Sequence, residues 1–572
     1  MKFLTLPFIF LLCFIVACQK KNIPAKTNNP TPVNVSVTPE EPVKVKKEKA
    51  KKFPDVNKFT VFLNDHINDS IAGNHPVRLA IGNDIIVIDT LIRNLYKAND
   101  FQGFWSDSAK CHHIITLLEN SRYDGLMPRD YGIPGLDSMF NECFLDKKKK
   151  NDTLYWKLEF TVTKNFIRYL NHLRFGKTNP ENIFKDWDYK RDPHLPHSSA
   201  ELSELLTQNP DTLAGEFRPQ YPMYNTLRSV LYTLDAAAKN NSYVWDKIPY
   251  IKDFKYGDTS LVIVKIKHRL LSIGLIDLEG DVSNVFDEDL LVALNYFQQH
   301  MDLTPNGKID KITIEKLNFT LQEIKDVVRV NMERCRWLLK GALPDYYIIV
   351  NVADYYLRIY KKDKLVYKTK VVVGTTKKET PLFHSKMSTI EFNPYWRVPI
   401  SIAGEEILPK LKTDPDYISR NNMELVLGDS VVQITDFSSY SKTNFPFVVR
   451  QKPGEDNSLG VVKFLFPNPY SIYFHDTPSK SLFEKDIRAF SHGCIRVQKP
   501  LELAAFLLSD QGMTSKDINQ MIKTKENIVI GLKEKIPVII TYWTCSTDKK
   551  NEVFFFKDIY GRDKLILKEL NN

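Results

Sequence analysis

The first half of the chain carries apolar residues at the three-to-four spacing of helices that bury one face. One series ends at Gly176, and another follows Pro222. Their members are Leu158, Val162, Phe166, Leu170 and Leu173 in the first series and Tyr224, Leu227, Leu231 and Leu234 in the second. Such stripes pack into a core and do not mark a ligand site. The pattern therefore predicts a helical scaffold domain over residues 58–255.

A second stretch of helical periodicity, between residues 256 and 320, predicts a compact module of three helices. Its apolar positions are Val262, Ile266, Leu270 and Ile273, then Leu291, Leu294 and Phe297, then Ile314 and Leu317. A further helix over 327–339 is expected to connect this module to the rest of the chain.

The pattern then changes to β-branched and aromatic runs, which predict strands over 346–352, 355–360 and 365–373. Lys362, Asp363 and Lys364 form the expected hairpin turn, and Gly374 ends the third strand. We therefore expect a β-rich domain over 321–545. Its stretch 403–454 lacks clear strand alternation and suits a cap, and 546–572 form a C-terminal extension. The predicted fold class is multidomain α+β.

The N-terminus has the features of an export signal. Lys2 precedes an apolar run over 3–17 that is too short to span a membrane. The run ends in Ile15-Val16-Ala17-Cys18, which resembles the lipobox of bacterial lipoproteins. That resemblance implies a signal peptide over 1–17 and a lipid on Cys18, the first mature residue. The alternative is an ordinary signal peptide with a chance cysteine.

Residues 18–57 have the composition of a disordered tether. Between residues 19 and 52 there are five prolines, no aromatic residue, and nine lysines against three acidic residues. This segment supplies +6 of the formal net charge of +10, so the basic balance does not indicate a nucleic-acid partner. Binding to lipid headgroups or to an acidic wall polymer is the alternative to a solvated spacer.

Five cysteines remain after Cys13 and Cys18 are set aside, namely Cys111, Cys143, Cys335, Cys494 and Cys545. An odd number allows at most two disulfides and leaves one free thiol. No Cys-x-x-Cys pair suggests structural zinc. A catalytic zinc on His475, His492 and Cys494 is the alternative, but the chain has no His-Glu-x-x-His helix. We expect no metal.

The strongest chemical signal is the pair Cys494 and His475, nineteen residues apart within Ser491-His492-Gly493-Cys494-Ile495-Arg496 and His475-Asp476-Thr477-Pro478. A thiol is nucleophilic as the thiolate, and an imidazole can take its proton, so the pair suits acyl transfer. Glycine beside the cysteine permits close approach of a carbonyl. The N–H groups of Gly493 and Cys494 are then candidates for stabilising an oxyanion.

These motifs occur in an order that resembles the L,D-transpeptidase catalytic domain. The upstream ones are Val371-Val372-Val373-Gly374, Thr380-Pro381 and Phe392-Asn393-Pro394-Tyr395-Trp396 with Val398-Pro399. Within 256–320, the residues Phe297, Gln298, Leu303, Gly307, Ile309, Thr313 and Leu317 resemble a peptidoglycan-binding-like repeat. The arrangement as a whole, including the tail Ile559-Tyr560-Gly561-Arg562-Asp563, is similar to large, membrane-attached L,D-transpeptidases of Gram-negative envelopes.

The resemblance implies that Cys494 is the nucleophile and His475 the base. Supporting residues on the same motif are His492, Gly493, Ser491 and Arg496. Arg496 either pairs with a substrate carboxylate or locks its loop. Asp476 is a candidate third member of a triad, although in this family a backbone carbonyl usually orients the imidazole. Trp396 and Tyr395 either line the substrate cleft or serve as core aromatics.

The implied reaction is two-step acyl transfer. Donor tetrapeptide stems of peptidoglycan lose D-alanine, and an acceptor amine then forms a 3-to-3 crosslink. No cofactor is implied, and carbapenems are expected to acylate the thiol. The expected partners are peptidoglycan stem peptides and, through the lipid, a membrane, which places the protein in the periplasm, on the outer membrane. L,D-carboxypeptidase action, protein-to-peptidoglycan anchoring and a non-enzymatic wall-binding tether remain alternatives.

Overall fold

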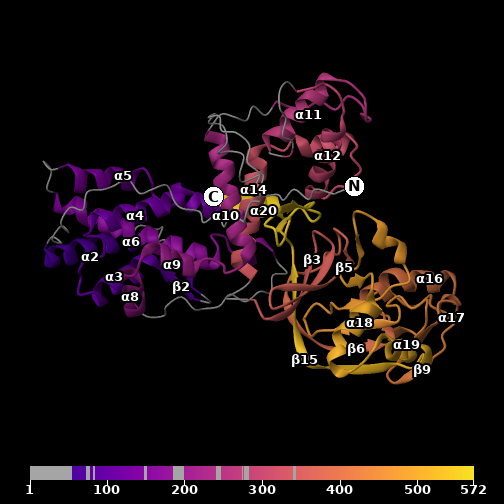
Figure 1. Ribbon diagram of the computed structural model, residues 1–572. Coiled ribbons are helices and arrows are strands. Elements are labelled where there is room, and N and C mark those ends of the chain that lie inside the picture. Colours follow the sequence, from indigo (N-terminus) through magenta and orange to yellow (C-terminus); the bar gives the residue numbers. More distant parts are fainter. Residues whose placement is uncertain are drawn as a thin grey trace.

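The computed structural model describes residues 55–72, 78–81, 84–146, 151–184, 199–239, 246–273, 275, 282–338 and 343–572. The predicted signal peptide, the predicted lipidation site Cys18 and nearly all of the predicted tether lie outside these residues. The described parts form a helical domain, a three-helix module and a β-rich domain that meet around α14 (Leu321–Leu338) (Figure 1).

The helical domain confirms the predicted periodicity, because all five apolar residues of the first series are buried on α6. It also contains a short antiparallel hairpin, in which Arg78 is opposite Val87. Its elements are α2 (Val56–Ala72), β1 (Arg78–Ile81), β2 (Asp84–Val87), α3 (Ile88–Ala98), α4 (Ser108–Glu119), η2 (Asn120–Asp124), η3 (Pro128–Tyr131), α5 (Gly135–Phe140), η4 (Asn141–Leu145), α6 (Asp152–Phe175), α7 (Pro180–Ile183), α8 (Ser199–Thr207), α9 (Pro210–Phe217) and α10 (Pro222–Lys239).

The module consists of α11 (Leu261–Ser272), α12 (Glu288–His300) and α13 (Lys311–Leu317), as predicted. Each helix begins at a side-chain cap, because Ser260, Asp287 and Asp310 accept hydrogen bonds from the first turn. Gln298 is buried and holds the loop after α12. Its amide oxygen accepts hydrogen bonds from the backbone N–H groups of Asn306 and Gly307. The module has its own hydrophobic core.

The connecting helix α14 begins at Leu321, six residues earlier than predicted. A capping box explains this start. Glu323 accepts from the N–H of Thr320 at 2.7 Å, and the Thr320 hydroxyl accepts from the N–H of Glu323 at 3.1 Å. On its sides, α14 packs against α10 and α20 (Asp563–Asn571), so it joins the helical domain to the end of the chain.

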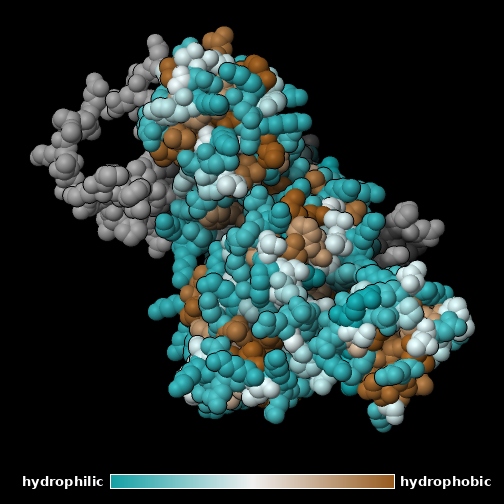
Figure 2. All heavy atoms as spheres, turned by 90° about the vertical axis from the view of Figure 1, so that its right-hand side faces the viewer, coloured by the Kyte–Doolittle hydropathy of each residue, from teal (hydrophilic) through white to brown (hydrophobic). Residues whose placement is uncertain are grey.

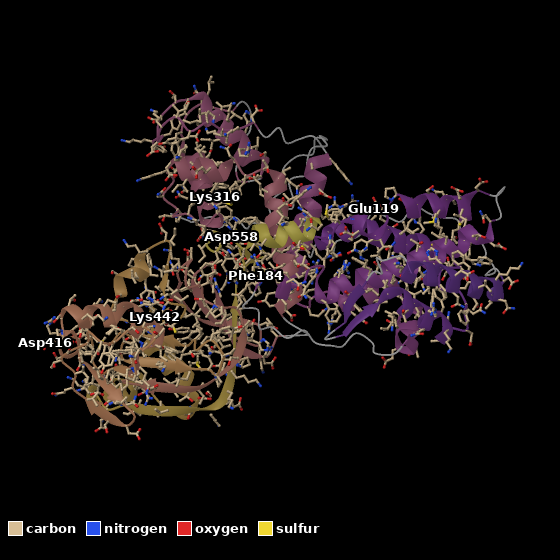
Figure 3. The ribbon with its side chains drawn as sticks, turned by 180° about the vertical axis from the view of Figure 1, so that it is seen from behind. Glu119, Phe184, Lys316, Asp416, Lys442 and Asp558 are labelled. Atoms are coloured by element: carbon tan, nitrogen blue, oxygen red, sulfur yellow. The ribbon has the colours of Figure 1, made fainter. Side chains whose placement is uncertain are left out.

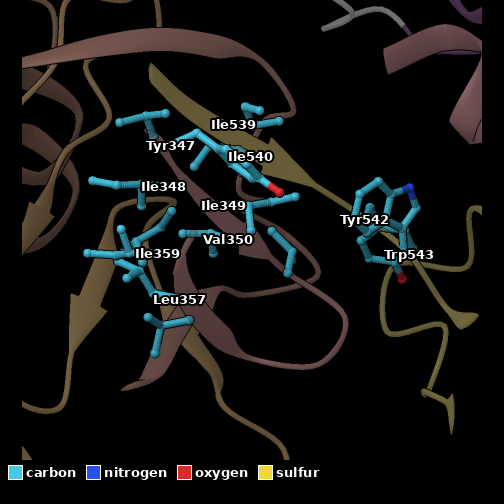
Figure 4. Packing of buried hydrophobic residues seen from close by; sticks show 14 of the residues in the cluster. Tyr347, Ile348, Ile349, Val350, Leu357, Ile359, Ile539, Ile540, Tyr542 and Trp543 are labelled. Carbon is cyan, nitrogen blue, oxygen red and sulfur yellow. The ribbon is translucent and has the colours of Figure 1, made fainter. Parts of the chain in front are cut away.

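The β-rich domain is built on a nine-stranded sheet in the order β13-β5-β14-β12-β11-β6-β15-β3-β4. A further pairing of β4 with β5 links the two ends, so the strands curl around one core, part of which Figure 4 shows. The strands are β3 (Tyr346–Asn351), β4 (Tyr356–Lys361), β5 (Lys364–Gly374), β6 (His384–Phe392), β11 (Val462–Leu465), β12 (Phe474–His475), β13 (Ala489–Ser491), β14 (Ile495–Val497) and β15 (Ile528–Thr541). The helices are η6 (Lys480–Glu484), α18 (Pro500–Leu508), η7 (Ser509–Gln511) and α19 (Ser515–Thr524).

The insertion forms a separate lobe, here called the cap, with its own core. It contains more strand than the sequence pattern predicts, because a four-stranded sheet runs in the order β7-β10-β8-β9. Its elements are β7 (Trp396–Arg397), α15 (Ile400–Ile402), η5 (Ala403–Ile407), α16 (Leu408–Thr413), α17 (Tyr417–Arg420), β8 (Met423–Leu427), β9 (Ser430–Val432) and β10 (Val448–Gln451). These strands are too short to give a clear alternation. Figure 3 shows Asp416 and Lys442 on this lobe, away from the helical domain.

After the sheet, the chain forms the hairpin β16 (Cys545–Thr547) and β17 (Val553–Phe555) and then α20. The predicted division at residue 545 falls on the first residue of that hairpin. Helix α12 of the module contacts β17, and the ring of His300 stacks on Phe554 with centroids 4.4 Å apart. The surface in Figure 2 is largely hydrophilic, with apolar residues in separate patches. Among the described helices, none has the length and apolar character needed to span a membrane.

Candidate functional site

The pairing of two short strands brings Cys494 next to the His475 strand. β12 and β14 are parallel, with Phe474 opposite Ile495 and His475 opposite Arg496. Cys494 immediately precedes β14, and the N–H of Ile495 donates to the carbonyl of Tyr473 at 3.2 Å. Residues 476–493, which include η6 and β13, therefore connect two strands that lie side by side in the sheet.

His475 is buried, and a backbone carbonyl orients it. Its Nδ1 hydrogen-bonds the carbonyl oxygen of Asp476, which makes Nδ1 the protonated nitrogen and leaves Nε2 as the proton acceptor. The Asp476 carboxylate binds Lys480 and accepts from the N–H of Val461 at 3.1 Å. Asp476 therefore orients the imidazole through its backbone and not as a triad carboxylate.

The loop before Cys494 is held by Ser491. The Ser491 hydroxyl donates to the carbonyl of Cys494 at 2.5 Å and accepts from the N–H of Gly493 at 3.1 Å. Gly493 has φ +109, a conformation that favours glycine. In the free protein Ser491 accepts from the Gly493 N–H, so a role of this amide toward an oxyanion stays a prediction. The Cys494 N–H is the other candidate donor.

Tyr473 is part of the site, and the sequence analysis missed it. Its backbone N–H and its phenol both hydrogen-bond the Cys494 thiol, and its ring centroid lies 5.7 Å from that of His475. The thiol also donates to the carbonyl of Ser471 at 3.8 Å. Residues two apart on an extended strand share a face, so the position of Tyr473 before His475 was a usable signal.

Both reacting groups are neutral in the free protein at neutral pH. Burial raises the pKa of the Cys494 thiol, and the hydrogen bonds from Tyr473 offset this only in part. Burial, and after it the Arg496 guanidinium, lower the pKa of His475 to about 3. The site therefore holds a thiol and a neutral imidazole, and proton transfer has to accompany attack on the substrate.

His492 points to the cap. Its Nε2 lies 2.7 Å from Oε1 of Glu406 on η5. Lys378, from the loop after β5, lies 3.7 Å from both Glu405 and Glu406, and Glu405 also pairs with Lys442. The hydrogen bond of His492 and the ion pairs of Lys378 thus connect the cap to two loops of the β-rich domain, one of which carries Cys494.

The two cleft candidates lie at the base of the cap. Trp396 packs against the cap core as part of β7. Tyr395 is 37% exposed, and the Arg450 guanidinium lies 4.8 Å from its ring centroid. The structure therefore gives Trp396 a packing role, and a role of either aromatic in the cleft stays a prediction.

The C-terminal tail supports the loop that carries Cys494. The Tyr560 hydroxyl donates to the carbonyl of Gly374 at 2.8 Å and accepts from the N–H of Thr380 at 3.2 Å. The Thr380 hydroxyl in turn donates to the carbonyl of Gly493 at 2.8 Å. Arg562 pairs with Glu379 in the same segment. The tail resembled the family in sequence, but these contacts were not predicted.

The three side chains considered as a zinc site have separate partners. His475 is held by the Asp476 carbonyl, His492 by Glu406, and Cys494 by Tyr473 and Ser471. In the described part of the chain, no group of three or more His, Cys, Asp or Glu side chains is arranged to hold a metal ion. Cys111, Cys335 and Cys545 are buried free thiols.

Three families match successive parts of the chain. Residues 90–231 match the scaffold domain family, and residues 262–317 match the "Putative peptidoglycan binding domain" family. Residues 345–540 match the L,D-transpeptidase catalytic domain.

A curated protein of Haemophilus influenzae named "Putative L,D-transpeptidase" is 35% identical over 255 residues. The match covers 43% of this chain and 50% of that protein, so the chain spans about half the length of this relative. Among solved structures, an L,D-transpeptidase from Stackebrandtia nassauensis is 13% identical, with 50% of this chain and 94% of that chain covered and a TM-score of 0.20.

An L,D-transpeptidase from Enterococcus faecium is 11% identical, with 35% of this chain and 50% of that chain covered and a TM-score of 0.15. The family matches follow the order of the helical domain, the module and the β-rich domain, and each lies within one of them. The chain therefore carries an L,D-transpeptidase catalytic domain, joined to a scaffold domain and a peptidoglycan-binding domain.

Proposed function

We propose that this protein is a cysteine L,D-transpeptidase that forms 3-to-3 crosslinks between peptidoglycan stems and releases D-alanine from donor tetrapeptides. The observation that carries the proposal is the β12–β14 pairing. It puts Cys494 beside the strand of a His475 whose Nε2 is left as acceptor, within a domain that matches the family.

In the first step, the Cys494 sulfur attacks the carbonyl carbon of the third stem residue, and the thiol proton passes to Nε2 of His475. The Cys494 N–H is our candidate for stabilising the oxyanion. The bond to the fourth residue then breaks, and the leaving amine of D-alanine takes the proton from His475. A thioester on Cys494 remains.

In the second step, the side-chain amine of a diaminopimelate on another stem attacks the thioester carbonyl. His475 takes a proton from that amine, the carbon–sulfur bond breaks as the amide forms, and the leaving sulfur takes the proton from His475. The cap supports transfer over hydrolysis, because a lobe anchored at Glu406 next to the nucleophile loop is placed to limit the entry of water.

We also propose that Cys18 is lipidated after removal of residues 1–17 and that the protein is attached to the outer membrane on its periplasmic side. The support is the sequence Ile15-Val16-Ala17-Cys18. Export to the envelope agrees with the peptidoglycan-binding match. Metabolic labelling with an alkyne fatty acid, compared between wild type and Cys18→Ser, tests the lipid, and equal labelling would contradict it.

The test of the reaction uses the chain from residue 19 onward, incubated with disaccharide-tetrapeptide muropeptides, with products followed by mass spectrometry. We expect a crosslinked dimer and free D-alanine, and neither product with Cys494→Ala. Tripeptide without dimer would identify a carboxypeptidase, and dimer from Cys494→Ala would rule out the nucleophile. Cys545→Ala is the matched control, since it removes a thiol that is buried away from the site.

A further inference from the structure

Four charged or titratable residues form a row across four adjacent strands at the site. Glu391 on β6 is opposite Lys463 on β11, Lys463 is opposite His475 on β12, and His475 is opposite Arg496 on β14. Residues directly opposite one another project from the same face of a sheet. All four side chains therefore lie on one face, and this face also carries Tyr473.

The opposite face of the same strands is apolar and fully buried. Phe392, Phe464, Phe474 and Ile495 alternate with the row and belong to the core. The polar row is thus the part of this sheet that can meet a ligand beside Cys494.

Arg496 is a partly buried cation that lacks a counter-ion. In the described part of the chain, no carboxylate lies within ion-pair distance of its guanidinium, and its buried Nε has no hydrogen-bond partner. Burial lowers the pKa of Arg496, and the charge of Arg496 in turn lowers the pKa of His475. Burying a charge without a partner is unfavourable, so an anion bound next to Arg496 would be stabilised.

Lys463 adds a second positive charge that is only weakly compensated. Its ammonium lies 3.9 Å from Glu391, at the limit of an ion pair, and 4.4 Å from the centroid of the Tyr473 ring. Glu391 also accepts a hydrogen bond from Asn527 at 3.0 Å. The face around the nucleophile therefore carries more positive than negative charge.

We propose that Arg496 and Lys463 form a carboxylate-binding site for the donor stem and that its ligand is the free C-terminal carboxylate of the residue that leaves. This assignment rests on the proposed function. In that substrate the terminal carboxylate is separated from the attacked carbonyl carbon by only one nitrogen and one Cα, a distance of up to about 4 Å. A group held at Cys494 thus brings its carboxylate to the cations nearest the thiol.

The site makes a tetrapeptide the correct donor length. A stem with one more residue places an uncharged amide where the carboxylate would be, and the guanidinium then stays unpaired. The bound carboxylate also offsets the positive charge beside His475, which favours proton uptake by the imidazole once the substrate is in place.

The first test compares three donors: the tetrapeptide acid, the same stem with D-alanine as its carboxamide, and a stem with the side-chain carboxyl of the third residue amidated. We expect wild type to lose on the order of 100-fold in kcat/KM on the terminal carboxamide and less than threefold on the other amide. In Arg496→Gln, kcat/KM for the tetrapeptide acid should fall to its value for the terminal carboxamide. Arg496→Lys should restore part of the preference for the acid. Arg420→Gln, an exposed cap residue, is the control.

Equal turnover of acid and terminal carboxamide by wild type would overturn the assignment, and so would a larger loss on the side-chain amide, which would place that carboxylate at the site instead. If wild type releases neither D-alanine nor D-alanine amide from any donor, the proposed function is contradicted and not the cationic site.

The second test needs no transpeptidase activity. Cys494 in the full chain is alkylated with iodoacetate or with the uncharged iodoacetamide, and the labelled peptide is identified by mass spectrometry. Relative to a free cysteine peptide, the site should favour iodoacetate about tenfold. Arg496→Gln and, separately, Lys463→Gln should each reduce that preference, so the test survives if one variant fails to fold. An unchanged ratio in both variants would overturn the proposal.

Discussion

At the residue scale, the free site holds Cys494 as a neutral thiol and His475 as a neutral imidazole, and not as a thiolate–imidazolium ion pair. Burial raises the pKa of Cys494 and lowers the pKa of His475, so both effects oppose charge separation. The backbone of Tyr473 and then its phenol oppose the first effect, because both lower the pKa of the thiol. Reactivity should therefore depend on Tyr473 and on pH.

We expect alkylation of Cys494 by iodoacetamide to be slower at pH 7 than that of a free cysteine and to keep rising above pH 9. The raised pKa leaves little thiolate at neutral pH, whereas an ion pair would give a rate independent of pH across the neutral range. Tyr473→Phe should shift the profile upward by about one pH unit, the equivalent of one lost hydrogen bond.

Tyr367→Phe is the matched control, since its hydroxyl bonds the Lys499 carbonyl away from the thiol. A flat profile between pH 5 and 8 would show that the thiolate is already formed and would contradict the neutral pair.

At the scale of elements, the loop that carries Cys494 depends on a segment from the far end of the chain. Tyr560 bridges Gly374 and Thr380, and Thr380 holds the carbonyl of Gly493. The tail thus fixes the position of the turn that presents Cys494. A displaced nucleophile lowers the rate more than it lowers substrate binding.

Tyr560→Phe is expected to lower kcat about tenfold with little change in KM, because it removes both hydrogen bonds of one hydroxyl but keeps the packing of the ring. Kinetics with the tetrapeptide donor and a thermal unfolding curve measure this. Tyr250→Phe is the control, as its hydroxyl donates to Asp253 at an exposed position ahead of the module. A proportional rise in KM with unchanged kcat would contradict a positioning role.

At the scale of the whole molecule, a buried charge network joins the helical domain to α14. Asp124 is buried and pairs with Arg218 and Arg228, both at 2.9 Å. Its backbone carbonyl accepts from Arg336 of α14, which also pairs with Glu333 at 2.6 Å. The arginines hold the pKa of Asp124 well below its usual range.

Asp124→Asn should lower the free energy of unfolding by about 3–5 kcal/mol, because it leaves the guanidinium groups buried without their counter-charge. Since the folded pKa of Asp124 is lowered, its contribution is present above the ordinary carboxyl pKa of about 4 and is lost as pH falls further. Calorimetry should show that the first unfolding transition of the variant occurs at a lower temperature than that of wild type at pH 7. In acid the two transition temperatures should lie closer together.

Glu119→Gln removes an exposed ion pair with Arg122 and should change stability by less than about 1 kcal/mol. Equal effects of the two variants would mean that the Asp124 network does not hold the domains together.

The sequence alone determined the local elements and the reacting pair. Helical stripes, the strands from residue 346 and the motifs around His475 and Cys494 depend on residues close in the chain, where periodicity and spacing carry the information. The sequence pattern missed the short strands of the cap, because two to five residues are too few for an alternation to stand out.

Only the tertiary structure determined which residues contact one another at the site. The structure shows that His492 hydrogen-bonds Glu406 of the cap and that the backbone carbonyl of Asp476, not its carboxylate, orients His475. It also shows that Lys463 and Arg496 lie in one row with His475. Each of these facts depends on strand register or on contacts between distant segments. A shift of one residue in register would turn the whole row to the other face, and no local pattern in the sequence fixes that register.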